Sequence, residues 1–185
     1  MSSVNAPSRP RCSVFIALSV DGYIARTNGS VDWLGVVQQD GEDYGYQQFV
    51  DSVDTLVIGR KTYELALSFE PWPYANKRCI VLTHRAAAPR YGEEFFDGEP
   101  QALLEKLERE AARHVYVDGG SVIQQFLAAK LVDQLTLSVI PVVLGAGIRL
   151  FAQEGPEQAL MLEEARPYPS GLTQLRYRLS AGDAA

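Results

Sequence analysis

The sequence predicts one α/β domain whose central sheet is mostly parallel and carries an antiparallel edge. Three observations lead to this fold class. Short apolar runs rich in β-branched residues alternate with amphipathic stretches, strand-like runs follow one another directly near the end, and Gly, Pro and Asp–Gly pairs separate the segments. Alternating strands and helices favour parallel pairing, whereas consecutive strands favour antiparallel pairing.

The first half of the chain opens with a polar, Pro-containing stretch over residues 1–11, which we expect to be a disordered leader. The run CSVFIALSV that follows is apolar and β-branched, as expected of a buried strand. In chain order, the expected elements are a strand at 12–20, a loop at 21–34, a helix at 41–52, a buried strand at 54–59 and a short helix at 61–69.

The second half begins after the two prolines of EPWPYANK interrupt the chain. Its clearest element is an amphipathic helix that carries Leu103, Leu104 and Leu107 on one face. In chain order, the expected elements are a strand at 78–83, a loop with at most one short strand at 86–98, the helix at 100–113, a strand at 114–120, a helix at 121–130, a long strand at 133–145, and strands at 158–166 and 171–179.

Composition limits the classes of function. The chain has 185 residues and a net charge of -6, which argues against a general binder of nucleic acids or anionic membranes. Cys12 and Cys79 form no CxxC pair and histidines are few, so we expect two reduced core thiols and no metal site. Neither a membrane-spanning apolar run nor the apolar region of a signal peptide is present, which predicts a cytoplasmic location. With no repeat or linker, residues 12–180 form one expected domain.

Three strand ends carry small or polar residues. They are Gly-Arg-Lys-Thr at 59–62, Leu-Thr-His-Arg at 82–85 and Asp-Gly-Gly-Ser at 118–121. Ligands of open α/β sheets bind outside the carboxyl ends of the strands, so we expect these three corners to converge on one site.

The chemistry of the corners suits an anion. Gly119 and Gly120 allow close approach of the backbone at a helix start that has free N–H donors. Arg60 and Lys61 lie at a second helix start, where cations oppose the helix dipole unless an anion is bound. A plain tight turn and a solvated corner are the structural alternatives, and neither GxGxxG nor GxxxxGK[ST] occurs.

Four segments, in this order and at these spacings, resemble the dihydrofolate reductase superfamily: FIALSVDGYIA, VIGRKTYE, IVLTHR and YVDGGSVIQQFL. The resemblance is closer to the C-terminal reductase domain of the bifunctional riboflavin-biosynthesis deaminase–reductase, whose strand and loop near the end of the fold look like IPVVLGAGIRLF. It implies an NADPH-dependent reductase that transfers a hydride to a C=N or C=O bond of a small heterocycle or of a ribosylated pyrimidine or pterin-like substrate.

The resemblance also implies a set of cofactor-binding residues. Arg60 falls where the family reads the adenosine 2′-phosphate, with Lys61 and Thr62 beside the pyrophosphate. His84 stands where the family often has Ser, so it either charges on cofactor binding or caps the strand. The full set implied is Ala17, Ile24, Gly59, Arg60, Lys61, Thr62, Leu82, Thr83, His84, Gly119, Gly120, Ser121, Val122 and Ile123.

The proton donor is less well defined. Dihydrofolate reductases place a carboxylate on the first helix, and the ungapped position here is Asp43, with Asp40, Glu42 or an ordered water as alternatives. A carboxyl group buried over a nicotinamide would have a raised pKa, as a donor near neutral pH requires. The structural alternative is an acidic helix start stabilised by the helix dipole.

Substrate contacts are implied for Trp33, Gln47, Val117 and Ser138. Trp33 would wall the pocket or anchor its loop to the core, and Gln47 replaces the aromatic residue that packs on a pterin, which disfavours folate. The resemblance also implies a homodimer formed through the last strands. No zinc-deaminase signature occurs, which excludes deamination by this chain. The alternatives are a non-catalytic NADP(H)-binding protein of the same fold and a dimerisation module without a ligand.

Overall fold

The structure is a computed structural model that describes residues 9–85 and 87–179. Its elements, in chain order, are β1 (Arg11–Ser19), β2 (Tyr23–Ala25), the 3₁₀ helix η1 (Asp32–Val37), α1 (Tyr46–Ser52), β3 (Thr55–Gly59), α2 (Arg60–Ala66), β4 (Arg78–Leu82), β5 (Glu94–Phe96), α3 (Pro100–Arg109), β6 (His114–Asp118), α4 (Gly120–Ala128), β7 (Gln134–Ile140), β8 (Ile148–Arg149), β9 (Leu160–Pro167) and β10 (Thr173–Leu179).

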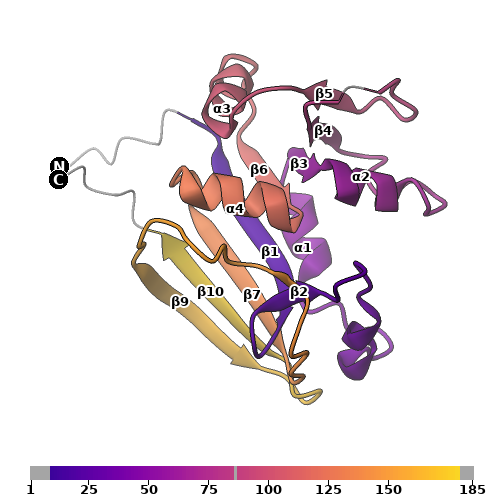
Figure 1. The fold of residues 1–185 in the computed structure, drawn as a ribbon, viewed down its shortest axis with the longest axis vertical. Helices are drawn as coiled ribbons and strands as arrows, with labels where there is room; N and C mark the ends of the chain where they lie inside the picture. The colour runs from indigo at the N-terminus through magenta and orange to yellow at the C-terminus, as the bar shows by residue number, and fades with distance from the viewer. Residues whose placement is uncertain (1–8, 86, 180–185) are drawn as a thin grey trace.

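The central sheet has eight strands in the order β5-β4-β3-β6-β1-β7-β10-β9. Every pair from β5 to β7 is parallel, whereas β10 runs antiparallel to both β7 and β9. In Figure 1 α4 crosses in front of β1, and β9 and β10 extend outward as the last pair. The predicted fold class, a mostly parallel sheet with an antiparallel edge, is confirmed. A separate two-stranded sheet joins β2 to β8.

Helices cover both faces of the parallel part of the sheet, and strand alternation decides which residue faces which layer. On β3, Val57 packs in the core shared with α3 and α4, whereas its neighbour Ile58 packs with α2. The leucines predicted for α3, among them Leu103 and Leu107, are fully buried. Truncating one of them to Ala would destabilise the fold by about 2–5 kcal/mol.

The helices expected at 61–69 and 100–113 end earlier, at Ala66 and Arg109, and the loop expected at 21–34 contains β2 and η1. Two further predicted boundaries were wrong for local backbone reasons. The helix expected from residue 41 begins only at Tyr46, because Gly41, Tyr44 and Gly45 have positive φ angles and form turns. The strand expected to reach residue 145 ends at Ile140, because the proline that follows has no N–H for the ladder.

The predicted leader is described only in part. Residues 1–8 lie outside the described residues, but β1 already begins at Arg11. Arg9 forms a two-pronged ion pair with Asp133, with N–O distances of 2.9 and 3.0 Å. Arg9 and Arg11 are therefore tied to the domain, although the leader was expected to extend to residue 11.

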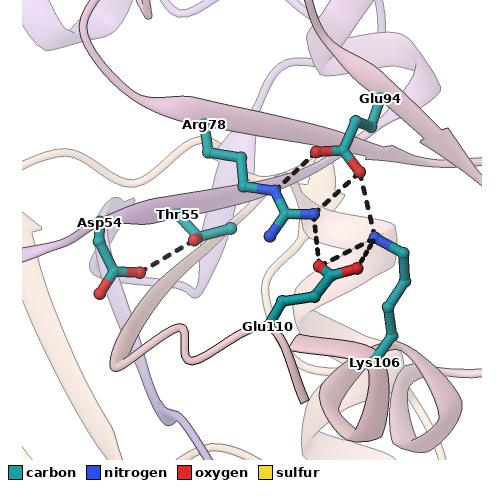
Figure 2. A network of polar contacts seen from close by, with 6 residues as sticks. All are labelled: Asp54, Thr55, Arg78, Glu94, Lys106 and Glu110. Atoms are coloured by element: carbon teal, nitrogen blue, oxygen red, sulfur yellow. Dashed lines mark hydrogen bonds and ion pairs between the residues drawn. The ribbon is translucent and has the colours of Figure 1, made fainter. Parts of the chain in front are cut away.

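An ion network fixes the outer edge of the sheet to α3 (Figure 2). Arg78 of β4 bonds Glu94 of β5 through Nε at 2.6 Å and Glu110 through Nη2 at 2.6 Å. Lys106 of α3 reaches the same two carboxylates at 3.1 and 3.0 Å. The hydrogen bond from Arg78 is the main reason that the pKa of Glu94 falls to about 2. The network braces the short strand β5.

Cys12 and Cys79 are buried free thiols, as predicted, and burial raises the pKa of each to about 12. Across 9–85 and 87–179, no helix is long and apolar enough to cross a membrane. In the same two segments, no group of three His, Cys, Asp or Glu side chains is arranged to hold a metal ion. The cytoplasmic location stays a prediction.

Candidate functional site

A cavity of about 1240 Å³ runs along the carboxyl ends of five adjacent strands. Residues from or just after β4, β3, β6, β1 and β7 line it, and these strands are neighbours in that order. Four inter-strand spacings of about 4.8 Å give the row a width of about 19 Å. The three corners singled out in the sequence do converge, and the hollow that they share is elongated.

The Gly–Gly corner leaves no room for side chains. Gly119 has a φ of +93°, and a Cβ there would lie 2.5 Å from Oγ1 of Thr62. A Cβ on Gly120 would lie 2.7 Å from Cδ1 of Ile24. The nine-residue helix α4 starts at Gly120, so its first N–H groups have no partner within the helix. The close packing and the free donors make this corner suitable for an anionic group.

Cationic side chains gather at the β3 and β4 corners. Arg60 donates from Nε to Glu64 and from Nη1 to the carbonyl of Arg85, both at 2.7 Å, so its guanidinium spans two strand ends. Lys61 is exposed beside it. His84 is exposed as well, and its Nδ1 lies 2.6 Å from Asp97. Among the described residues, this end of the cavity therefore carries the arginine, lysine and histidine side chains of the lining, together with the carboxylates of Glu64 and Glu99.

The other end of the cavity is aromatic. Phe15, Tyr46 and Tyr116 line it, with ring centroids 5.7 Å apart for Phe15 and Tyr46 and 6.5 Å apart for Tyr46 and Tyr116. Tyr116 donates its hydroxyl to the carbonyl of Phe15 at 3.1 Å. Flat side chains with their polar atoms already engaged form a surface suited to a planar ring.

Asp118 lies between the two ends. It closes β6, keeps some surface toward the cavity, and is otherwise enclosed by protein. Loss of water raises its pKa, and a 2.8 Å hydrogen bond from the N–H of Gly119 only partly opposes that effect. A carboxyl group with a raised pKa on the wall of a cavity is the type of group that can donate a proton.

Asp43 does not have the environment expected of the proton donor. It lines the cavity, but it is exposed and accepts the N–H groups of Gln47 and Gly45, each at 2.9 Å. Those hydrogen bonds lower the pKa of Asp43, and the bond from the N–H of Gln47 contributes most. The expectation of a buried carboxyl with a raised pKa was wrong at this position. Among the alternatives, Glu42 lines the cavity and is exposed, and Asp40 is exposed and does not line it.

Most of the predicted cofactor residues do line the cavity. They are Ala17, Ile24, Gly59, Arg60, Lys61, Thr62, Leu82, Thr83, His84, Gly119, Gly120, Ser121 and Val122. Ile123 does not, because it lies fully buried in the core under α4. The structure thus brings these residues together along one cavity.

The predicted substrate residues are placed less well. Ser138 lines the cavity and accepts a hydrogen bond from Gln174 at 3.1 Å. Val117 is fully buried in the core on the opposite face of the sheet. Trp33 is also buried, packed with Ile140, Tyr168 and Leu172, so it anchors its loop instead of walling the cavity.

Gln47 points elsewhere as well. Its side chain is exposed and donates to Asp51 at 2.9 Å, and it does not line the cavity.

The aromatic residues that line the cavity were missed by sequence reasoning, although strand alternation carried a signal. Phe15 precedes Ala17 by two residues, and Tyr116 precedes Asp118 by two, so each pair shares a face of the sheet.

Asp21 fixes the loop after β7 beside the glycine corner. It accepts the N–H groups of Leu144 at 3.0 Å and Gly145 at 2.7 Å, and the hydroxyl of Ser19 at 2.6 Å. The bond from Ser19 contributes most to lowering the pKa of Asp21 to about 2. The same loop brings Ile148 against Gly120.

Comparisons with known proteins agree with this architecture. The family model described as the RibD C-terminal domain matches residues 10–174. The uncharacterized protein YwjB of Bacillus subtilis is 35% identical over 169 residues, which are 89% of this chain and 95% of that protein.

Two solved structures are also similar. A putative riboflavin biosynthesis protein from Shewanella aligns with a TM-score of 0.85 and 32% identity, over 91% of this chain and 98% of that one. A Thermotoga maritima diaminohydroxyphosphoribosylaminopyrimidine deaminase/5-amino-6-(5-phosphoribosylamino)uracil reductase aligns with a TM-score of 0.72. At 17% identity, over 92% of this chain and 57% of that one, it shares the fold.

Proposed function

The chain belongs to the RibD C-terminal domain family, and from that premise we propose that it is an NADPH-dependent reductase of a small heterocyclic substrate. One observation carries the proposal. A single cavity joins a basic, glycine-lined end to an aromatic end, with the Asp118 carboxyl between them. Such a cavity suits a dinucleotide and a second, flat ligand bound side by side.

The basic end would hold the phosphates of the cofactor. Arg60 is already oriented by Glu64 and the carbonyl of Arg85, and Lys61 and His84 lie nearby, so these side chains suit the 2′-phosphate. Gly119 and Gly120 would receive the pyrophosphate at the start of α4. When bound, NADPH would supply the hydride that the reduction needs.

The residues of the chain would orient the acceptor and supply a proton. The rings of Phe15, Tyr46 and Tyr116 would stack on the substrate, and its C=N or C=O bond would face the nicotinamide site near Ala17 and Ile24. Asp118, which is held toward its protonated form, would donate to the atom next to the one that receives the hydride. This assignment replaces Asp43.

Cofactor discrimination tests the proposal at the basic end. Arg60→Ala should weaken NADPH binding and leave NADH binding nearly unchanged, because only NADPH carries the 2′-phosphate. Arg85→Ala is a matched control, because Arg60 uses the backbone carbonyl of Arg85 and not its side chain. An Arg60→Ala protein with an unchanged preference for NADPH would remove this role from Arg60.

A non-catalytic NADP(H)-binding protein of the same fold is the second candidate. It is favoured by the state of Asp43, where a proton donor was expected: the side chain is exposed, and its backbone hydrogen bonds lower its pKa and stabilise the ionised form. The two candidates differ in one result. Saturable binding of NADPH, with no loss of reduced-cofactor absorbance across a panel of pterins and pyrimidines, would select the binding protein.

A homodimer is also expected. The edge strand β9 is exposed along its whole length and presents Leu160, Met161 and Leu162 with 41, 51 and 54% of their surface exposed. Apolar side chains on an open strand edge are an association surface. Size-exclusion chromatography with light scattering should give twice the chain mass, and Met161→Lys should shift the protein toward the monomer.

A further inference from the structure

We propose that the substrate presents no phosphate or carboxylate to the protein, because the aromatic half of the cavity fits an uncharged or cationic planar heterocycle. The inference deepens the proposed function and rests on it, since it assigns the basic half of the cavity to the cofactor. It is drawn from how charge is distributed among the described residues that line the cavity.

All the arginine, lysine and histidine side chains that line the cavity, among the described residues, belong to the cofactor half. Arg60 and Lys61 follow β3, and His84 follows β4. From β3 the order of strands continues through β6 and β1 to β7, so β1 lies about 10 Å and β7 about 14 Å from the nearest cationic corner. A ring stacked over β1 and β7 therefore lies two to three strand spacings away from these side chains.

The charged side chains of the aromatic half are carboxyl groups. Asp118 closes β6, and Glu42 and Asp43 precede α1. The segment of Glu42 and Asp43 lies on the β10 side of the cavity, because the carbonyl of Tyr44 accepts a hydrogen bond from Gln174 of β10 at 3.0 Å. A phosphate there would face the exposed carboxylates of Glu42 and Asp43 and would lose water without gaining a cation from the described cavity lining.

The neutral groups of this half favour a ring with few exposed polar atoms. Phe15 and Tyr46 present ring surfaces, and the hydroxyl of Tyr116 is engaged by the carbonyl of Phe15. The Oγ atom of Ser138 already accepts a hydrogen bond from Gln174. Aromatic faces beside carboxyl groups attract a ring that carries no charge or a positive one.

The compound named for the Thermotoga maritima protein makes a useful contrast. A 5-amino-6-(5-phosphoribosylamino)uracil carries a phosphate on its ribose. In this chain, that phosphate would lie in the half of the cavity whose charged lining, among the described residues, is acidic. We therefore expect selection against the phosphate, even though the fold is shared.

A pair of compounds that differ only by this phosphate tests the inference. Full-length protein is saturated with NADPH, and 5-amino-6-(ribosylamino)uracil is compared with its 5′-phosphate by NADPH oxidation and by calorimetric binding. The unphosphorylated compound should bind or react better by about tenfold or more. Equal or better use of the phosphorylated compound, or binding of neither at millimolar concentration, would overturn the inference.

Adding a positive charge at the rim of the cavity sharpens the test. Gln38 lines the aromatic half and is exposed, so Gln38→Lys adds a cation without disturbing the core, and Gln38→Met is the uncharged control of similar length. The lysine variant should narrow the gap between the two compounds, and the methionine variant should preserve it. An unchanged gap in the lysine variant would contradict the electrostatic origin. NADPH binding, measured first without substrate, separates failure of this inference from failure of the proposed function.

Discussion

Replacing Gly119 with Ala perturbs the glycine corner at its tightest point. The backbone has a φ of +93°, a conformation that costs a residue with a side chain about 1–3 kcal/mol. The added Cβ would lie 2.5 Å from Oγ1 of Thr62, whose β-branched side chain is stiff and can move only by leaving its rotamer, at about 0.5–1.5 kcal/mol. We expect a destabilisation of about 2–4 kcal/mol, or roughly 5–15 °C in Tm.

Gly92→Ala separates backbone strain from the contact with Thr62. Gly92 has a similar φ of +88° and nothing within 4 Å of its Cβ position, and it does not line the cavity. Differential scanning calorimetry should show the smaller loss of Tm for Gly92→Ala. NADPH affinity should fall only in Gly119→Ala, by roughly tenfold to a hundredfold if one charge-assisted hydrogen bond is lost. Equal melting temperatures together with unchanged NADPH affinity would refute the role of this corner.

Three further predictions concern carboxyl groups. The pKa of Asp118 is raised, so its ionised form destabilises the fold at pH values above the ordinary aspartate pKa of 3.8. Asp118→Asn should therefore raise Tm at neutral pH, and it should abolish turnover. A lower Tm with turnover intact would contradict both expectations. The pKa of Glu94 is lowered to about 2, so its contribution to stability is present above pH 4.5 and is lost as the pH falls toward 2. Glu94→Gln should reduce the pH dependence of the free energy of unfolding in this range by at most about 1 kcal/mol, since the side chain is 41% exposed. An unchanged pH dependence would show that Glu94 does not contribute to acid unfolding. Asp21→Asn should speed amide exchange at Leu144 and Gly145, whereas unchanged exchange by mass spectrometry would show that the loop is held by other contacts.

The fold and the convergence of the three strand-end corners on one cavity could be predicted because their signals are local. The glycines at 119–120 and the cations at 60–61 each lie within a few residues of a strand end, and parallel strands bring such ends together. Ile123 was the exception, because the fourth residue of α4 turns away from the cavity into the core.

The arrangement of the aromatic half of the cavity depended on features that spacing does not show. Asp43 was expected to be buried, but Gly45 and Tyr44 adopt positive φ angles that delay α1 and leave the carboxylate in water. Asp118 gained its raised pKa from enclosure by neighbours distant in sequence, which no local pattern records. Val117 and Asp118 are consecutive residues of β6 and point to opposite faces of the sheet, so Val117 lies in the core and Asp118 lines the cavity.

Calorimetric titration of the purified 185-residue chain with NADPH, and then with NADH, tests the central claim most directly. Saturable binding of one NADPH per chain is expected, with NADH weaker by about tenfold or more because it lacks the 2′-phosphate that we propose Arg60 would hold. A titration without heat at millimolar NADPH, on protein that melts cooperatively, would contradict the assignment of this cavity to a nicotinamide cofactor.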